Sequence, residues 1–398
     1  MKRRTFLAAT LRGAVAASLG TVMPRVLLAD AATDSRFVLI ILRGALDGLA
    51  AVPPFGDGNY AAKRGALAIT APEYRLDGLF ALNPGFTHLY ERYRANELIV
   101  FHAAASPYRE RSHFDGQDLL ENGTTRPGVA RDGWLNRALP ALPAARVHTT
   151  EQLAVALSQN LPLVLRGDAP VNSWAPSRLP DADGDTLQRI ADLYETEPYF
   201  AERLQAALAA STLANGGMMA AGRDPLGQFG QISSAAGRLL AAPNGARIAV
   251  IEASGWDTHA NQGAEQGQLV NRLHALDNGI DALRVALDDA WGKTAVMVVT
   301  EFGRTVAVNG TRGTDHGTAT SAFLVGGAVN GGKVVADWPG LATSSLYQGR
   351  DLQPTLDLRC VFKGVLAAHL GASESVLETR IFPESRNARV LDGLIRRA

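Results

Sequence analysis

The chain of 398 residues is predicted to fold as a three-layer α/β/α sandwich with a largely parallel central sheet. Short apolar runs rich in β-branched residues alternate with amphipathic helical patterns from residue 36 onwards. A long helical pattern over 266–291 joins the runs at 247–253 and 295–300, and such a crossover places two parallel strands in one sheet. Hydrophobic residues make up 46% of the chain, which is enough for a large core.

Strands are predicted where apolar runs are continuous, because such runs suit strands that are buried on both faces. The first is RFVLIIL at 36–42, and the second is LIVF at 98–101, which ends at His102. Further strands are predicted at 247–253, 295–300 and 320–325. Residues 152–157 and 161–165 are expected to be associated with the sheet.

Helices are predicted where apolar residues recur at spacings of three and four. The pattern at 266–291 places six residues on one face: Leu269, Leu273, Leu276, Ile280, Leu283 and Leu287. Other helical patterns cover 85–95, 134–139, 187–213, 225–242 and a C-terminal segment that ends near His369. His369 is interpreted as a packing residue. The Pro-, Gly- and Asp-rich stretch at 53–87 predicts a surface excursion with little regular structure.

The N-terminus is typical of an export signal. Lys2, Arg3 and Arg4 precede a weakly apolar segment, and 29–31 (Ala-Asp-Ala) offers a cleavage site. The run at 3–7 (RRTFL) is similar to a twin-arginine motif, so the export machinery of that pathway is an expected partner. We therefore predict a signal peptide at 1–31 and a single domain at 32–398, located in the periplasm or otherwise outside the cytoplasm. A disordered or amphipathic basic N-terminus is the alternative.

Charge and cysteine content narrow the classes of partner. Lys+Arg and Asp+Glu are both 39, so the zero formal net charge favours neither nucleic acid nor a general anionic surface. No stretch after the signal is apolar enough to predict a membrane span. Cys360 is the only cysteine, which excludes an intramolecular disulfide. The closely spaced Asp181, Asp183 and Asp185 lack the closing Glu of a calcium loop and are interpreted as a solvated turn.

Carboxylate and imidazole side chains follow several predicted strands. Ligands in open α/β sheets collect at the carboxyl ends of strands, so these residues are candidates for a metal or hydrolytic site. The candidate metal ligands are Asp47, Asp257, His259, Glu301, Asp315 and His316. For Asp47 a turn or helix-cap role is an equal alternative. Mixed oxygen and imidazole ligands suit a divalent ion.

The segment at 103–123 holds a second set of candidates. Ser112 and Asp115 have the spacing of a capping box, which predicts a helix that begins at His113. A hydroxyl at a helix N-terminus beside Arg109 and Arg111 is suited to an anionic ester, either as a nucleophile or as part of an anion cradle. Ser112 as a simple helix cap is the alternative. A G-x-S-x-G elbow, a phosphate-binding Walker loop and a His-x-x-x-His pair are all missing, which disfavours the common hydrolase, nucleotide-binding and zincin motifs.

Five stretches together resemble the alkaline phosphatase/sulfatase superfamily and, within it, the exported bacterial group DUF1501. These stretches are VLIILRGALDGL, HAAASPYRERSHFDGQDLLENG, GWDTHANQG, VVTEFGRT and GTDHGTATSAFLVGGAVNGG. The resemblance implies an alkaline phosphatase-like fold. It also implies that Asp47 follows the first strand as a ligand, that Ser112 is the nucleophile, and that Asp257 and His259 bind metal.

The resemblance admits two registers for its last motif. By letters, Asp315 and His316 match an Asp-His pair of the superfamily. By strand order, which is preferred, Glu301 and Phe302 take those places and His316 is the last histidine. One metal position then has Asp257, His259 and His316, and the other has Asp47 and Glu301 without an imidazole.

The resemblance implies a metal-dependent hydrolase of phosphate or sulfate esters that uses Ser112 or a metal-bound water. Arg109, Arg111 or Arg304 would stabilise developing charge, and His113 would act as acid or base. The metal is left open among Zn, Mn, Mg and Ca, and an anionic small-molecule ester is the implied ligand. The alternative is a non-catalytic periplasmic binding or assembly protein that retains a degenerate hydrolase fold.

Overall fold

A computed structural model describes residues 34–176, 184–194, 196–215 and 225–397. The predicted signal peptide at 1–31 falls outside the described residues, as do Asp181 and Asp183. Within the described part of the chain, no helix has the length and apolar character needed to cross a membrane.

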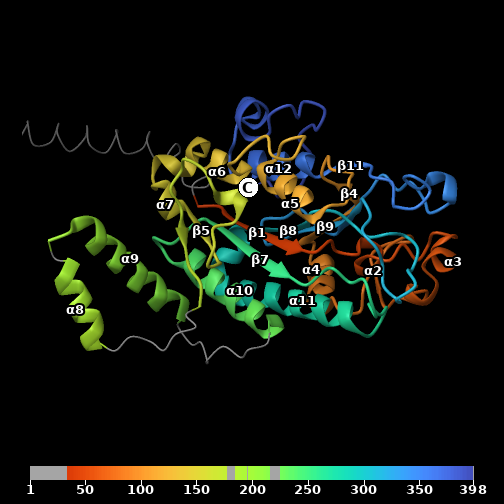
Figure 1. Ribbon diagram of the computed structural model, residues 1–398, viewed down its shortest axis with the longest axis horizontal. Coiled ribbons are helices and arrows are strands. Elements are labelled where there is room, and N and C mark those ends of the chain that lie inside the picture. The colour runs from red at the N-terminus through yellow and green to blue at the C-terminus, as the bar shows by residue number, and fades with distance from the viewer. Residues whose placement is uncertain (1–33, 177–183, 195, 216–224, 398) are drawn as a thin grey trace, which may run out of the picture.

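In the described ranges, nine strands form the central sheet, in the order β10-β4-β9-β8-β1-β7-β5-β6 with β11 beside β4 (Figure 1). Only β9 runs against its neighbours β4 and β8, and the other pairings in this sheet are parallel. The strands are β1 (Arg36–Arg43), β4 (Leu98–Ala105), β5 (Ala154–Ala156), β6 (Asn172–Ser173), β7 (Ile248–Ser254), β8 (Thr294–Thr300), β9 (Thr320–Val325), β10 (Lys333–Val335) and β11 (Leu356–Asp357). The predicted strands at 36–42, 98–101, 247–253, 295–300 and 320–325 are thus confirmed.

Helices cover both faces of the sheet (Figure 1). One face packs against α5 (His113–Asn122), α6 (Trp134–Ala138) and α12 (Leu358–Ala368). The other face packs against α4 (Thr87–Arg94), α10 (Pro225–Ala241) and α11 (Gln268–Leu287). The predicted three-layer sandwich with a largely parallel sheet is therefore confirmed. The remaining α-helices are α2 (Gly48–Ala51), α3 (Tyr60–Arg64), α7 (Thr150–Leu153), α8 (Gly184–Tyr194), α9 (Pro198–Asn215) and α13 (Glu374–Val376).

The long helix α11 shows why the spacing of apolar residues predicted a helical layer on the sheet. All six apolar residues expected on one face, from Leu269 to Leu287, are buried against the sheet. Burial of a leucine side chain contributes roughly 1.5–3 kcal/mol, so this stripe holds α11 on the sheet whatever its intrinsic helix propensity. His369, next to the end of α12, is also buried, and its Nε2 bonds the carbonyl of Arg36 at 2.7 Å, as expected of a packing residue.

The stretch at 53–87 is more ordered than predicted. It contains α3 and a two-stranded sheet of β2 (Tyr74–Arg75) and β3 (Ala81–Leu82), and it buries Tyr60, Arg64 and Phe80. Its glycines and prolines mark real turns, but its scattered apolar side chains fill the space beside the sheet because tertiary packing outweighs local composition.

The register of the central strands brings the candidate site residues to one edge. Arg43 of β1 pairs with Ser254 of β7, and Leu42 of β1 pairs with Thr300 of β8, so the three carboxyl ends are level. The loops that follow meet closely at Gly44, where an added Cβ would lie 2.6 Å from the backbone nitrogen of Asp257. The glycine also has a φ of 121°. Only glycine accommodates this approach.

Candidate metal centre

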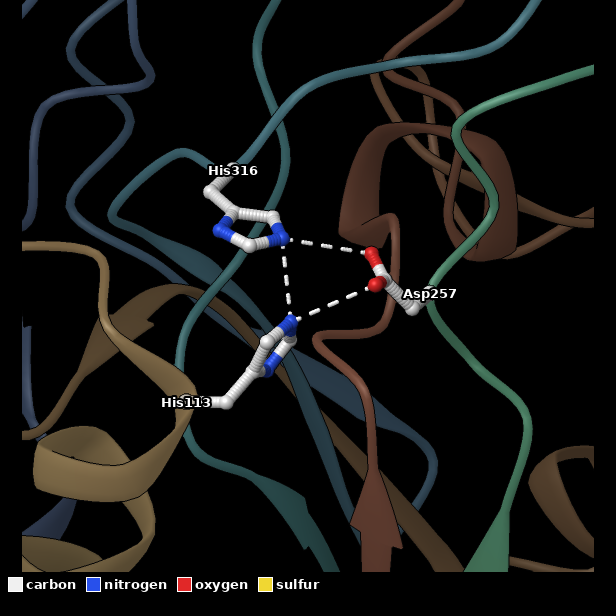
Figure 2. Close-up of side chains that lie close together, drawn as sticks. All are labelled: His113, Asp257 and His316. Carbon is white, nitrogen blue, oxygen red and sulfur yellow. Dashed lines mark hydrogen bonds and ion pairs between the residues drawn. The ribbon is translucent and has the colours of Figure 1, made fainter.

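Three side chains from distant parts of the sequence face one another at this edge (Figure 2). His113 is the first residue of α5, Asp257 follows β7, and His316 precedes β9. The two Nε2 atoms are 2.9 Å apart. Asp257 lies 3.5 Å from His113 Nε2 through Oδ2, and 3.3 Å from His316 Nε2 through Oδ1. We call His113, Asp257 and His316 the metal group, since each offers one ligand atom to a common point.

Acceptors on the far side of each ring set the direction of the two imidazoles. His113 Nδ1 lies 2.8 Å from Glu301 Oε1, and His316 Nδ1 lies 3.0 Å from the carbonyl of Arg111. Both acceptors are oxygens without a proton, so each Nδ1 carries the hydrogen and donates it. In the neutral rings, both Nε2 atoms therefore present lone pairs to the same space, which is the arrangement that metal-binding histidines require.

The surroundings shift the pKa values of the two imidazoles in opposite directions. The hydrogen bond to Glu301 raises the pKa of His113, while burial lowers the pKa of His316. Without an ion, two lone pairs 2.9 Å apart repel, and a proton on His113 Nε2, donated to His316, relieves that repulsion. The pair is thus arranged to share either one proton or one cation.

Asp257 is the carboxylate of the group, and Arg304 holds it. Burial is the strongest single influence and would raise the pKa of Asp257, but the hydrogen bond and charge of Arg304, together with His259 and His316, keep the pKa below its ordinary value. Arg304 is almost fully buried and also bonds both the carbonyl and the hydroxyl of Thr314. The guanidinium of Arg304 thus lies against a member of the metal group, and its predicted role beside developing charge stays a prediction.

His259 and Asp315 lie on the more exposed side of the metal group. His259 Nε2 is 3.0 Å from Asp257 Oδ1 and 3.0 Å from His316 Nε2, while its Nδ1 is 3.3 Å from Asp315 Oδ1. The structure therefore brings His259 to the group and places Asp315 behind His259, next to Asn309.

Glu301 is completely buried behind His113. Its Oε1 accepts from His113, from the backbone of Gly44 at 2.9 Å and from Gln117 at 3.1 Å, and its Oε2 accepts from Thr300 at 2.7 Å. These bonds outweigh the effect of burial and lower the pKa of Glu301. Such a carboxylate orients a histidine ligand from behind. The ring of Phe302 stacks on that of His113 with centroids 5.0 Å apart.

Asp47 is held by other partners. It is the N-cap of α2 and accepts from Ala50 at 3.2 Å through Oδ1. Its Oδ2 accepts from Arg64 at 2.5 Å and from Gln262 at 2.6 Å, and both Asp47 and Arg64 are buried. The structure thus does not bring Asp47 into the metal group, and the cap role left open by the sequence is the one observed.

Ser112 stands at the N-terminus of α5, so the predicted helix start at His113 is confirmed. The predicted capping box is wrong, because Ser112 makes no side-chain cap hydrogen bond and Asp115 accepts instead from the hydroxyl of Tyr108 at 3.2 Å. The guanidinium of Arg109 donates to the backbone carbonyls of Ser106 and Tyr108.

Sequence reasoning treated His113 as an acid or base and missed its place opposite His316. The predicted helix start could have indicated this place, because it puts His113 in the first turn of α5, beside the strand ends. Gln117, one turn later, was also missed as a partner of Glu301. Its spacing of four from His113 on a helix puts both side chains on one face.

The family described as Protein of unknown function (DUF1501) matches residues 102–381, which is more than half of the chain. No curated protein matches the sequence. Three solved structures show distant similarity. Ps i-CgsB in complex with k-i-k-neocarrahexaose is 11% identical, with a TM-score of 0.41 over 89% of this chain and 77% of its own.

The C-terminal periplasmic domain of EcEptC from Escherichia coli, in complex with Zn, is 9% identical, with a TM-score of 0.38 over 88% of this chain and 87% of its own. Phosphonate monoester hydrolase of Agrobacterium radiobacter is 12% identical, with a TM-score of 0.32 over 86% of this chain and 77% of its own. At such low identities and scores, the chemistry of the site rests on its own residues.

Proposed function

Since the chain belongs to the DUF1501 family of proteins of unknown function, we propose a function from the site itself: a divalent-metal-dependent hydrolase of phosphate or sulfate esters. The observation that carries the proposal is the meeting of two imidazole Nε2 atoms and one carboxylate within 4.8 Å of one another. The oxygen acceptors behind both rings, Glu301 Oε1 and the carbonyl of Arg111, add to it.

The spacing of the donor atoms fits a small transition-metal ion. Bonds of about 2.0–2.1 Å in a tetrahedral zinc site separate neighbouring ligand atoms by about 3.3 Å. The three separations here are 2.9, 3.3 and 3.5 Å, which bracket that value. Two imidazoles among three ligands favour Zn or Mn over Ca or Mg, which prefer oxygen ligands. Three protein ligands also leave a coordination position for a substrate or nucleophile.

A divalent ion at this site supplies charge neutralisation for a phosphoryl or sulfuryl group and makes a nearby nucleophile more acidic. The chain's own groups supply the rest. Arg304 holds Asp257 in place with a buried positive charge. His259 has the most exposed of the three imidazole side chains, 44% against 25% for His113 and 26% for His316, and it is placed to move a proton between the site and solvent.

Ser112 is the proposed nucleophile. It precedes His113 in the chain and stands at the start of the ten-residue helix α5, with a hydroxyl that makes no side-chain cap hydrogen bond. The unpaired N–H groups of a helix N-terminus favour an anionic ester beside it. A water molecule as the nucleophile is the competing route.

Metal analysis of the protein purified without chelator tests the proposal. We expect close to one equivalent of Zn or Mn, and a rise in melting temperature when that metal is restored to chelated protein. A screen of phosphate and sulfate esters then compares wild type with Ser112→Ala. Loss of turnover in the variant, with metal content unchanged, supports Ser112, whereas equal turnover removes Ser112 from the mechanism in favour of water.

One observation favours the alternative of a non-catalytic binding or assembly protein. Phe302, which the resemblance aligns with an imidazole, packs on His113 and offers no ligand atom. A second metal position beside Glu301 therefore lacks nitrogen donors. If the protein neither retains nor is stabilised by Zn, Mn, Mg or Ca, the hydrolase proposal is wrong and this alternative takes its place.

We also propose that the protein works in the periplasm or otherwise outside the cytoplasm, after export by the twin-arginine machinery. Arg3 and Arg4 in the run RRTFL support this route. Replacing both by lysine is expected to leave the chain in the cytoplasm in a fractionation experiment, and normal export of that variant would rule out the route.

A further inference from the structure

A cavity of about 450 Å³ opens beside the metal group, between α5, the ends of β1 and β7, and the loop at 160–166. Gln117 connects the two features. It lines the cavity, and its amide donates to the Glu301 oxygen that holds His113. We call this space the α5 cavity. Its volume is in the range of small-molecule sites.

The lining of the α5 cavity carries an excess of one negative charge, from the three carboxylates of Asp118, Glu121 and Glu252 against the two guanidiniums of Arg43 and Arg166. Arg43 donates to Glu121 at 2.7 Å and to Glu252 at 2.8 Å, so one guanidinium faces two carboxylates. Glu252 uses only Oε1 for these bonds and is 27% exposed, and its Oε2 accepts no hydrogen bond from any residue in the described ranges. A ligand in the cavity can therefore donate to a free carboxylate oxygen of Glu252, and an anionic group at that end of the cavity is repelled.

The outer wall offers an aromatic face. Phe114 directly follows His113 in α5, lines the cavity and is 88% exposed. An exposed phenylalanine beside a candidate active site provides a surface on which a ring can stack or over which a cation can lie. Ring stacking at Phe114 and hydrogen bonding at Glu252 are thus available to one ligand.

Resting on the proposed function, we propose that the α5 cavity is the subsite for the alcohol portion of the ester, and that it takes an uncharged or cationic ring bearing a hydroxyl or ammonium group. The anionic ester group lies at the metal group, and the ring extends along α5 between Phe114 and Glu252. The site thereby separates the two halves of the substrate by charge.

Three phenols of similar size test this preference. Tyramine carries an ammonium group, tyrosol a hydroxyl and 4-hydroxyphenylacetate a carboxylate at the same place. Their binding to the metal-free protein is measured by ligand-detected NMR titration, which requires neither metal nor turnover, so failure of the hydrolase proposal leaves this test intact. We expect tyramine and tyrosol to bind at least about tenfold more tightly than the acid. Equal binding of all three, or binding of none, overturns the proposal.

Substitutions then locate the binding. Phe114→Ala is expected to weaken tyramine and tyrosol by about fivefold or more. The matched control is Val285→Ala, which removes another exposed apolar side chain, 62% exposed, from α11 and is expected to change nothing. Glu252→Gln keeps the size of the side chain and is expected to reduce the preference for tyramine over tyrosol. If Phe114→Ala binds both probes as wild type does, the ring lies elsewhere and the subsite is wrong.

Discussion

Two polar clusters lie at the carboxyl ends of the central strands, and they differ in how completely fixed donors occupy the carboxylate. In the metal group, Asp257 is partly exposed: the buried Arg304 bonds its Oδ1, while its Oδ2 faces the imidazole of His113. In the second cluster, Asp47 is buried, its Oδ2 is paired with the buried guanidinium of Arg64, and its Oδ1 accepts from the backbone of Ala50. The difference teaches that a carboxylate after a strand becomes a candidate ligand only where its fixed partners leave one of its oxygens free.

A chain of hydrogen bonds joins the two clusters. Gln262 donates to Asp47 at 2.6 Å, and its carbonyl oxygen accepts from Thr314 at 2.8 Å. Thr314 in turn accepts from Arg304, which holds Asp257. The comparison can therefore be tested by disturbing either cluster and measuring both stability and metal binding.

The largest effect is expected from the buried ion pair. Arg64→Met leaves Asp47 buried without its cation and should lower the free energy of unfolding by about 3–5 kcal/mol. Urea denaturation in the presence of chelator measures this. Arg284→Met, which breaks a partly exposed pair with Asp281, serves as the control and should cost less than about 1 kcal/mol. Similar losses in both variants would show that Asp47 does not depend on Arg64.

The next largest effect is expected from low pH, which should lower the free energy of unfolding through the buried His102. Burial lowers the pKa of His102 from 6.5 to about 4, and its Nε2 bonds the carbonyl of Val52 at 3.0 Å. Between these pH values the unfolded chain takes up a proton that the folded protein refuses. The contribution of the neutral, buried His102 to the free energy of unfolding is therefore fully present above about pH 6.5. This contribution is lost as the pH falls, which lowers the free energy of unfolding by about 3 kcal/mol at pH 4.

His102→Gln checks the assignment of this pH dependence. The variant should show a smaller fall in the free energy of unfolding between pH 7 and pH 4 than wild type, whatever its stability at pH 7. Urea denaturation with chelator at several pH values gives both curves. His274→Gln, an exposed site on α11, should leave the slope unchanged. Identical slopes for wild type and His102→Gln would assign the effect to other groups.

Removal of a proposed ligand should affect metal binding more than folding. We expect His316→Ala to weaken Zn binding by about 100-fold, which corresponds to about 2.7 kcal/mol. The unfolding free energy in chelator should change by less than about 1 kcal/mol, because the side chain is only partly buried. Competition with a chromophoric chelator measures the affinity, with His274→Ala as the control. Unchanged affinity in His316→Ala would remove this residue from the metal group.

The smallest effect is expected from the carboxylate behind His113. Glu301→Gln keeps an oxygen that can accept from Nδ1 but removes the charge, so Zn affinity should fall by only about tenfold. Glu265→Gln, an exposed change of the same chemistry, should leave affinity as it is. A loss as large as that of His316→Ala would indicate that Glu301 binds the ion directly.

The sheet and its helices were predictable because they depend on local periodicity. Continuous apolar runs specified β1, β7 and β8, and the stripe from Leu269 to Leu287 specified α11, since burial of these side chains is the dominant favourable term in folding. The polar residues after the strands were predictable for a related reason, because parallel strands deliver their carboxyl ends to one edge. The antiparallel direction of β9 was not predicted, since an apolar run has no direction.

By itself, the sequence determined which elements form and which strand ends carry carboxylates and imidazoles. Tertiary structure alone decided which of them meet. His113 and His316 are 203 residues apart, and only the packing of α5 against the strand ends brings their Nε2 atoms to 2.9 Å. Arg64 reaches Asp47 from a stretch whose composition suggested a surface excursion. Hydrogen bonds and ion pairs act over a few ångströms, so partners far apart in sequence are chosen by the packing of the apolar core.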